Sequence, residues 1–335
     1  MNMLIKRGTI GILLLCGVFV LAACGEKSQE DVVEELNQAV EEMEGYKAEA
    51  SMAMNTGEEQ QMYSIQTWFQ QDDFYRVTLS NNEDEKENQI ILKNEEGVFV
   101  LTPALNKDFK FQTEWPDNSS QPYLFQSLVK DVLADSEATF ENTEDAYVFT
   151  TKTNYQSNNN LPYQEIHFDK KNYTPQAVKV LDNDRQPLVE VEFNEFELDP
   201  GFDEGDFQKE SIMETAAVAE ASTEPASSYS VLYPSYTADA ELTEERETDT
   251  ESGKRVLLNY GGEKNFTIVQ EPAEPLGSPQ TVNGDIVNLG SVVGALTSNT
   301  LEWHAGGVDY TLASDDLTKE EMIDVARSIH DQTTK

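Results

Sequence analysis

Hydrophobic and polar residues alternate with a period of two through most of the segment 46–198. This alternation is typical of β-strands that bury one face, and turn-forming runs such as Asn158-Asn159-Asn160 separate the apolar stretches. Many antiparallel strands with few helices indicate one large, curved sheet. Strands are predicted at residues 48–55, 63–70, 74–80, 89–93, 98–102, 138–142, 147–153, 163–168, 177–181 and 188–198.

The last of these strands changes phase along its length. Val191 and Phe193 share one face, whereas Phe196 and Leu198 continue in the opposite phase. One extra residue in a strand produces such a slip and also bends and twists the strand. The pattern therefore predicts a β-bulge near residues 194–195.

Helical periodicity replaces the alternation in three places. Residues 31–44 form an amphipathic pattern that Gly45 stops, and a second helix is predicted near 121–135. A third helix begins at Thr318, where Glu321 three residues later completes a capping box. Its apolar stripe consists of Met322, Val325, Ala326 and Ile329.

The composition changes after the last long strand. Residues 210–228 are rich in Ala, Glu, Ser and Thr, which is typical of a linker. Beyond them, Gly306-Gly307 predicts a two-residue hairpin, and strands are predicted at 256–260, 266–270, 301–304 and 308–312. We therefore expect a first domain at 24–209, a linker at 210–228 and a small C-terminal α+β domain at 229–335.

The N-terminus has the layout of a secretory signal peptide. The basic pair Lys6-Arg7 precedes an apolar run at 10–20 that is too short to span a bilayer. The run ends in Leu21-Ala22-Ala23-Cys24, which resembles the bacterial lipobox. The resemblance implies that residues 1–23 are removed by cleavage between Ala23 and Cys24. Cys24 would then carry a covalent diacylglycerol, with acyl chains such as palmitate.

Charge and cysteine content narrow the possible partners. The net charge is −40, and removal of the basic pair with the signal would make it −42. Such a chain repels nucleic acid and anionic lipid headgroups, so acyl chains would have to hold it at the outer face of the cytoplasmic membrane. The other cysteine, Cys16, leaves with the signal, so no disulfide or thiol chemistry is expected.

Several short runs resemble known families. The run WFQQDDFYRV at 68–77 and the run NEEGVFVLTP at 94–103 resemble the LolA-like lipoprotein-carrier family. The run ALNKDFKF at 104–111 and the run LEWHAGGVDYTL at 301–312 are similar to the YdcC family of sporulation-associated lipoproteins of Gram-positive spore formers. The arrangement of a LolA-like domain before a small second domain also resembles the RseB family of periplasmic sigma-factor regulators.

The resemblance implies an α+β fold: a half-barrel of about eleven antiparallel strands with helices on its apolar concave face. In the carrier family that face accepts acyl chains or an apolar segment of a partner. Aromatic residues are the candidates for such a groove, although the same side chains are also expected to fill the core. In the carrier an arginine latches the lid, whereas Gln71 takes that position here and cannot form a bidentate clamp. The groove candidates are Trp68, Phe74, Phe99, Phe109 and Trp115.

No catalytic constellation is evident. The histidines, His167, His304 and His330, are few and scattered, and no metalloprotease, nucleophile-elbow or nucleotide-binding motif is present. We therefore expect neither an enzyme nor a cofactor. The spacing of one acidic run fails the calcium-loop pattern, so a solvated loop is predicted at Asp199, Asp203, Glu204 and Asp206.

These observations favour a non-enzymatic, membrane-anchored extracytoplasmic lipoprotein with a binding or scaffold role in sporulation or in spore-envelope peptidoglycan assembly. Its expected partner is a protein at the envelope or spore wall. A homodimer formed by pairing of strands between two copies is a further option. Two alternatives remain open. One is a lipid or lipoprotein chaperone that holds an acyl lipid in an apolar cavity. The other is an envelope-stress sensor that restrains a signalling partner.

Overall fold

A computed structural model describes residues 27–55, 60–81, 84–103, 106–117, 120–155, 161–219, 229–273, 280–282, 284–289 and 292–330. The predicted signal peptide and Cys24 lie outside these described residues. No helix in the described ranges is both long and apolar enough to cross a membrane.

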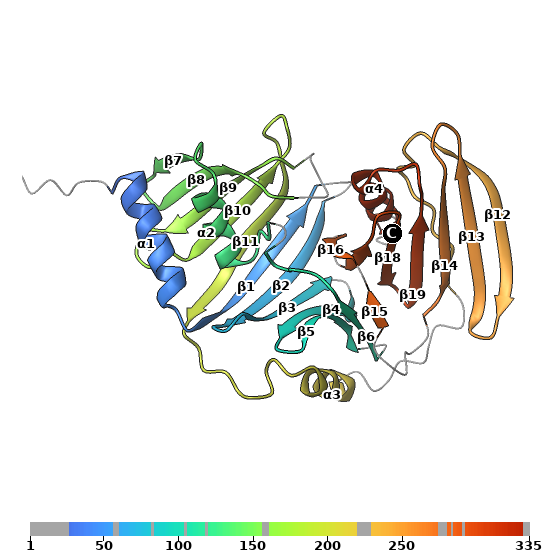
Figure 1. The fold of residues 1–335 in the computed structure, drawn as a ribbon, viewed down its shortest axis with the longest axis horizontal. Coiled ribbons are helices and arrows are strands. Elements are labelled where there is room, and N and C mark those ends of the chain that lie inside the picture. The colour runs from blue at the N-terminus through green and yellow to red at the C-terminus, as the bar shows by residue number, and fades with distance from the viewer. Residues whose placement is uncertain are drawn as a thin grey trace, which may run out of the picture.

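The first sheet contains twelve of the described strands and curves around two helices (Figure 1). Its order is β15-β6-β5-β4-β3-β2-β1-β11-β10-β9-β8-β7. Strands β1 to β11 pair antiparallel with one another, which confirms the predicted half-barrel and the α+β fold class. Their bounds are Gly45–Met54, Gln61–Gln70, Phe74–Asn81, Asp84–Asn94, Gly97–Thr102, Lys107–Phe111, Thr139–Asn142, Ala146–Lys152, Tyr163–Asp169, Pro175–Leu181 and Pro187–Leu198.

Helices α1 (Gln29–Glu42) and α2 (Phe125–Ala134) cover one face of this sheet, which we call the inner face. A capping box fixes the start of α1, since Ser28 Oγ accepts from Asp31 N and Asp31 Oδ2 accepts from Ser28 N. Helix α2 lacks a side-chain cap of its own, and Tyr46 Oη from β1 accepts a hydrogen bond from Phe125 N at 3.2 Å. The predicted helices at 31–44 and 121–135 are therefore confirmed with small shifts of their ends.

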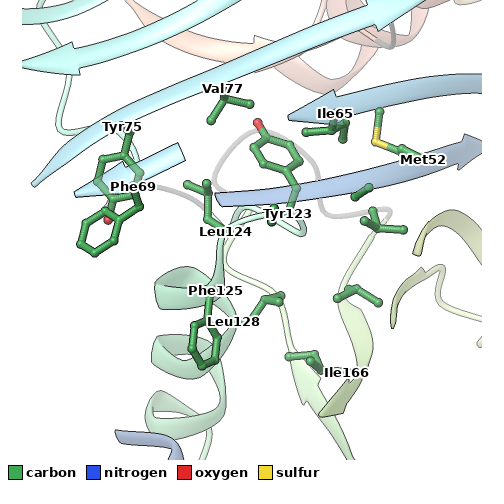
Figure 2. Close-up of a cluster of buried hydrophobic side chains, with 14 of the residues drawn as sticks. Met52, Ile65, Phe69, Tyr75, Val77, Tyr123, Leu124, Phe125, Leu128 and Ile166 are labelled. Carbon is green, nitrogen blue, oxygen red and sulfur yellow. The ribbon is translucent and has the colours of Figure 1, made fainter. Parts of the chain in front are cut away.

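The inner face and its two helices form the main core, shown in Figure 2. Alternate residues of each strand point into it, so Phe69 of β2 and Tyr75 of β3 pack together with ring centroids 4.9 Å apart. Phe125 and Leu128 of α2 are fully buried against the strands. Burying each such side chain contributes about 1.5–3 kcal/mol.

The predicted bulge in β11 is confirmed. Glu49 of β1 pairs with Glu195, and the next residue, Ala50, pairs with Phe193, so Asn194 has no partner in the ladder. This extra residue explains the change of phase in the apolar pattern.

The opposite, outer face of β2 to β5 is covered by the segment that follows β11. Helix α3 (Lys209–Ala219) begins one residue before the predicted linker and runs into it, and its Ile212 is 3% exposed. Together with Phe207, Ile212 packs on Leu92 of β4 and Leu101 of β5. The prediction of a linker from residue 210 was therefore wrong for the first half of that segment, because it is helical and packs on the sheet through Ile212 and Met213.

The second sheet has the order β12-β13-β14-β19-β18-β17-β16. The final helix, α4 (Lys319–His330), packs on it, and Thr318 and Glu321 form the predicted capping box through hydrogen bonds of 3.0 and 3.2 Å. The Gly306-Gly307 hairpin is also confirmed, since both residues have positive φ. The strands are Glu241–Thr250, Gly253–Gly261, Phe266–Pro272, Asp285–Asn288, Val293–Leu296, Thr300–Ala305 and Val308–Ala313 for β12, β13, β14, β16, β17, β18 and β19.

The two sheets share structure across the expected domain boundary. Strand β15 (Gln280–Val282) pairs parallel with β6 at the end of the first sheet. Val293 and Ala295 of β17 are buried in the main core of the half-barrel. The C-terminal part of the chain therefore helps to fill the inner face.

Candidate functional site at the junction of the two sheets

The five aromatic residues predicted to line one groove lie on opposite faces of the first sheet. Trp68, Phe74 and Phe99 belong to the cluster on the outer face. Phe109 and Trp115 pack with the main core on the inner face. The expectation of one groove formed by all five is therefore wrong. Strand alternation explains the division, because side chains at successive strand positions point to opposite faces.

The inner face is largely filled by the chain's own side chains. Trp115 is 1% exposed and meets Tyr75 edge to face, with ring centroids 5.6 Å apart. Helices α1 and α2 cover one part of the face, and β17 covers another through Val293 and Ala295. A small cavity of about 70 Å³ remains between the half-barrel, β16 and α4.

A second cavity, of about 230 Å³, lies where β5 and β6 face β14 and β17 to β19. Phe109 of β6, one of the predicted groove residues, lines it together with Trp303 and Tyr310, whose rings stack at 5.1 Å. Pockets for drug-sized ligands are usually about 300–1,000 Å³. The junction cavity is smaller and therefore suits a small polar molecule better than an acyl chain.

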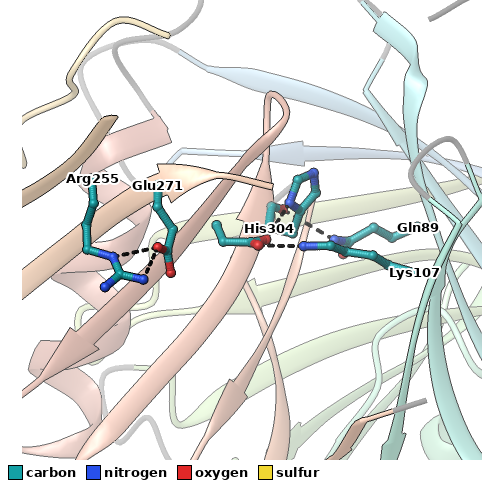
Figure 3. A network of polar contacts seen from close by, with 6 residues as sticks. Gln89, Lys107, Arg255, Glu271 and His304 are labelled. Atoms are coloured by element: carbon teal, nitrogen blue, oxygen red, sulfur yellow. Dashed lines mark hydrogen bonds and ion pairs between the residues drawn. The ribbon is translucent and has the colours of Figure 1, made fainter. Parts of the chain in front are cut away.

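A buried polar network beside this cavity connects the two sheets, as Figure 3 shows. Lys107 of β6 is 2% exposed, and its Nζ lies 2.5 Å from Asp309 Oδ2 of β19. Asp309 Oδ1 lies 2.9 Å from His304 Nδ1 on the neighbouring strand β18. The carboxylate of Asp309 therefore bridges a lysine of the first sheet and a histidine of the second.

Gln89 of β4 adds two hydrogen bonds between the sheets. Its Nε2 donates to His304 O at 3.3 Å, and its Oε1 accepts from Val293 N at 2.6 Å. The side chain is 2% exposed, so both bonds are shielded from water. Gln89 thus satisfies backbone hydrogen-bonding groups of β17 and β18 where these strands meet the half-barrel.

Burial and pairing set the charge states at the junction. Burial lowers the pKa of His304, and this effect outweighs the opposing influence of Asp309. Burial acts to raise the pKa of Asp309, but hydrogen bonds from His304 and Lys107 lower it overall. The pKa of Glu302, which also lines the cavity, is raised by burial. Asp309 is therefore ionised at neutral pH, and a neutral His304 donates its Nδ1–H to it.

The contacts of this network hold the two sheets together. Each ionisable group in the core of the network already has a partner, and a nearby pair, Arg255 and Glu271, lies at 2.5–2.6 Å on the second sheet (Figure 3). Sequence analysis missed this network because it treated His304 as an isolated histidine. A signal was present, since a two-residue hairpin at Gly306-Gly307 places His304 directly opposite Asp309.

The other residues considered for chemistry have structural roles. His167 Nε2 lies 2.7 Å from Glu165 Oε1 on the same strand. Asp199 accepts hydrogen bonds from the backbone of Glu44 and Gly45, which fixes the start of β1. Across the described ranges, no group of three or more His, Cys, Asp or Glu residues is placed to hold a metal ion.

The fold and the junction define a class of protein: an α+β half-barrel whose inner face is partly closed by a second sheet. The family model described as "Sporulation protein YdcC-like" matches residues 6–207. The chain is also 48% identical over 331 residues to the Sporulation protein YdcC of Bacillus subtilis (strain 168), covering 97% of this chain and 98% of that protein. The chain therefore belongs to the YdcC-like family of sporulation proteins, which confirms the resemblance seen in the sequence.

Solved structures show weaker likeness. The complex of Pseudomonas aeruginosa MucA/MucB matches with a TM-score of 0.35 and 15% identity, covering 89% of this chain and 96% of that chain. The LolA superfamily protein NE2245 from Nitrosomonas europaea matches with a TM-score of 0.32 and 10% identity, covering 55% of this chain and 99% of that chain. At these TM-scores neither likeness says what this chain binds.

Proposed function

We propose that the chain is a membrane-anchored extracytoplasmic lipoprotein that acts in sporulation by binding a protein partner at the envelope or spore wall, without catalysis. The observation that carries this proposal is the filled inner face. A carrier needs an internal space for cargo, whereas the inner face here is packed with the chain's own side chains and the cavity beside it at the junction has a volume of about 230 Å³. A protein whose interior is occupied acts through its outer surfaces.

The role in sporulation is supported by the curated relative, whose name is Sporulation protein YdcC and which matches nearly the whole chain. Neither its name nor the family description is that of an enzyme. Building or modifying spore peptidoglycan is the process in which we place the partner.

The anchor is supported by the geometry of the first described residues. Lys27 Nζ hydrogen-bonds to Glu35 at 3.1 Å and also to Tyr173 Oη, so the chain is attached to the half-barrel from this residue on. Cys24 precedes Lys27 by three residues, which span at most about 10 Å when fully extended. A diacylglycerol on Cys24 would therefore hold the α1 end of the half-barrel close to the lipid headgroups.

The anchor is tested by labelled palmitate and by the variant Cys24→Ser. We expect the label to enter the wild-type chain only, and the variant to leave the membrane fraction. Retention of Cys24→Ser in the membrane would refute the lipid anchor.

The partner is tested by cross-linking in sporulating cells, with the anchored protein as bait. We expect one envelope protein to be captured in near-stoichiometric amounts, and a wall enzyme would identify the scaffold role. Capture of a signalling protein, with altered transcription and unchanged wall composition on deletion, would instead identify the stress sensor. Recovery of the bait with acyl lipid and no protein would contradict partner binding.

A further inference from the structure

A groove of about 560 Å³ lies on the outer face beside α3, and it shares no lining residue with the junction cavity. One wall is the turn between β4 and β5, and the other is the segment that leads from β11 into α3. Its volume lies within the range of ligand sites. The described lining residues comprise three phenylalanines, three amides and five carboxylic acids, with no lysine or arginine among them.

The floor of the groove is aromatic. Phe207 is 5% exposed, and its ring lies 5.9 Å from that of Phe74 and 5.1 Å from that of Phe202, measured between centroids. A hydrogen bond of 2.9 Å from Asn94 Nδ2 to Phe207 O fixes the covering segment to the turn of the sheet. Phe74 and Phe202 are half-buried, so part of each ring faces the groove.

The rim of the groove is acidic and faces solvent. Its carboxylates come from both walls: Glu95, Glu96, Asp203, Glu204 and Glu210. Of the lysines beside the rim, Lys93 pairs with Asp73 at 2.5 Å, and Lys209 pairs with Asp108 at 2.7 Å and lies 3.7 Å from Oε1 of the rim residue Glu210. The potential of the groove is therefore negative even within this acidic chain.

The adjoining aromatic cluster already binds cations of the chain itself. Lys47 Nζ lies 4.9 Å from the ring centroid of Phe202 and 4.3 Å from that of Trp68. The guanidinium of Arg76 lies 4.7 Å from the same Trp68 ring. Aromatic rings attract lysine and arginine at such distances through their quadrupole. The rings and the carboxylates thus favour the same kind of ligand.

We propose that this groove binds a lysine- or arginine-containing segment of a protein partner. The aromatic floor receives the aliphatic stem and charged head of a basic side chain, and the acidic rim pairs with its neighbours. Gln70 and Gln208 line the groove and offer amide groups to the backbone of the segment. The rim carboxylates do not form a metal cluster, so an organic cation is the matching ligand. The proposal rests on the proposed function, in that it names the chemistry of the partner.

The test is a fluorescence-anisotropy titration of the full mature chain with a labelled peptide in which arginine alternates with serine. The groove variant is Glu95→Gln, Glu96→Gln and Glu204→Gln combined. The matched control removes the same three charges from exposed positions of the second sheet, by Glu241→Gln, Asp249→Asn and Glu251→Gln. We expect the groove variant to weaken binding about tenfold at low salt and the control by less than about twofold.

A second variant, Phe74→Leu, keeps an apolar side chain and removes one ring of the floor. We expect it to weaken binding about threefold, with an unchanged thermal unfolding midpoint showing that the variant folds. Equal weakening of peptide binding by the groove variant and the matched control would overturn the proposal, because the affinity for the peptide would then depend only on the overall charge of the protein. Equal affinity for arginine methyl ester and for the peptide would also overturn it, since the groove would be a small-cation site.

The same groove variant separates this proposal from the proposed function. If it still captures the envelope partner in sporulating cells with wild-type yield, partner binding stands and the groove assignment is wrong. If the peptide binds as expected but no protein is captured by the wild type, the groove assignment stands and partner binding fails.

Discussion

The buried ion pair between Lys107 and Asp309 is the contact that most directly connects the two sheets, and removing its negative partner tests that role. The variant Asp309→Asn leaves the shape of the site nearly unchanged. It also leaves the positive charge of Lys107 enclosed without a counter-charge, because the Lys107 side chain is 2% exposed. His304 loses its charged acceptor at the same time.

The magnitude follows from the burial of the two partners. Breaking a fully buried ion pair by removing one partner costs about 3–5 kcal/mol. The Asp309 side chain is 33% exposed, so solvent offsets part of this cost. We therefore expect Asp309→Asn to lower the free energy of unfolding by about 2–3 kcal/mol. Adding Lys107→Met removes the stranded charge and should recover most of the loss, since a buried pair replaced by apolar groups is often neutral.

The assay is urea unfolding followed by tryptophan fluorescence, because Trp303 lies at the junction cavity and Trp115 lies in the main core. The matched control is Glu137→Gln, which breaks an ion pair with Lys152 that has the same 2.5 Å distance but exposed side chains. We expect no shift of the unfolding midpoint for the control. Equal effects of Asp309→Asn and the control, or no recovery in the double variant, would refute the reasoning.

Four further predictions concern the junction and the elements around it. Burial lowers the pKa of His304 in the folded protein, so its contribution to stability is present above the pKa of the unfolded chain, about 6.5, and is lost as the pH falls below that value. A pH series of urea midpoints should show this loss, and His304→Asn should make the loss smaller. The pKa of Asp309 is also lowered, so its own contribution should be lost only below about pH 3.9, in the same acid series. Ile212→Ala should cost about 2–4 kcal/mol and make α3 sensitive to limited proteolysis, whereas intact resistance would contradict its role in fastening the segment. Thr318→Ala should cost about 1 kcal/mol by removing the cap of α4, measurable as a lower melting temperature, and an unchanged value would show that the cap is dispensable.

Much of the half-barrel could be predicted from the sequence because one face of each long strand is buried. That burial imposes the period-two pattern, and even the bulge at Asn194 was visible as a change of phase. The capping box at Thr318 and the Gly306-Gly307 hairpin were predictable for a different reason, since local backbone geometry requires those residue types.

The strands that sequence analysis missed lack this alternation. Strand β12 is exposed along nearly its whole length and has no apolar face to reveal it. Strand β6 begins with Lys107, a charged residue that is buried only because β19 supplies Asp309. Helix α3 was taken for a linker because its composition is polar and small, while its apolar contact with the sheet comes from Ile212 and Met213 among the described side chains.

The candidate site depended on tertiary contacts that a single sequence does not contain. Strand parity alone would have separated Trp68 from its neighbour Phe69, and therefore the outer aromatic cluster from the inner one. The hairpin register would have paired His304 with Asp309. Predicting that Lys107 lies against this pair requires knowing how the second sheet packs on the first.

The inner face is occupied by the chain's own side chains, and we propose on this ground that the protein acts through its outer surfaces. Native mass spectrometry of the chain lacking residues 1–24, exported by a Gram-positive host through a different cleavable signal, tests it most directly. We expect the mass of the polypeptide alone, with no acyl lipid retained. A stoichiometric acyl lipid that survives purification and leaves only on denaturation would contradict it.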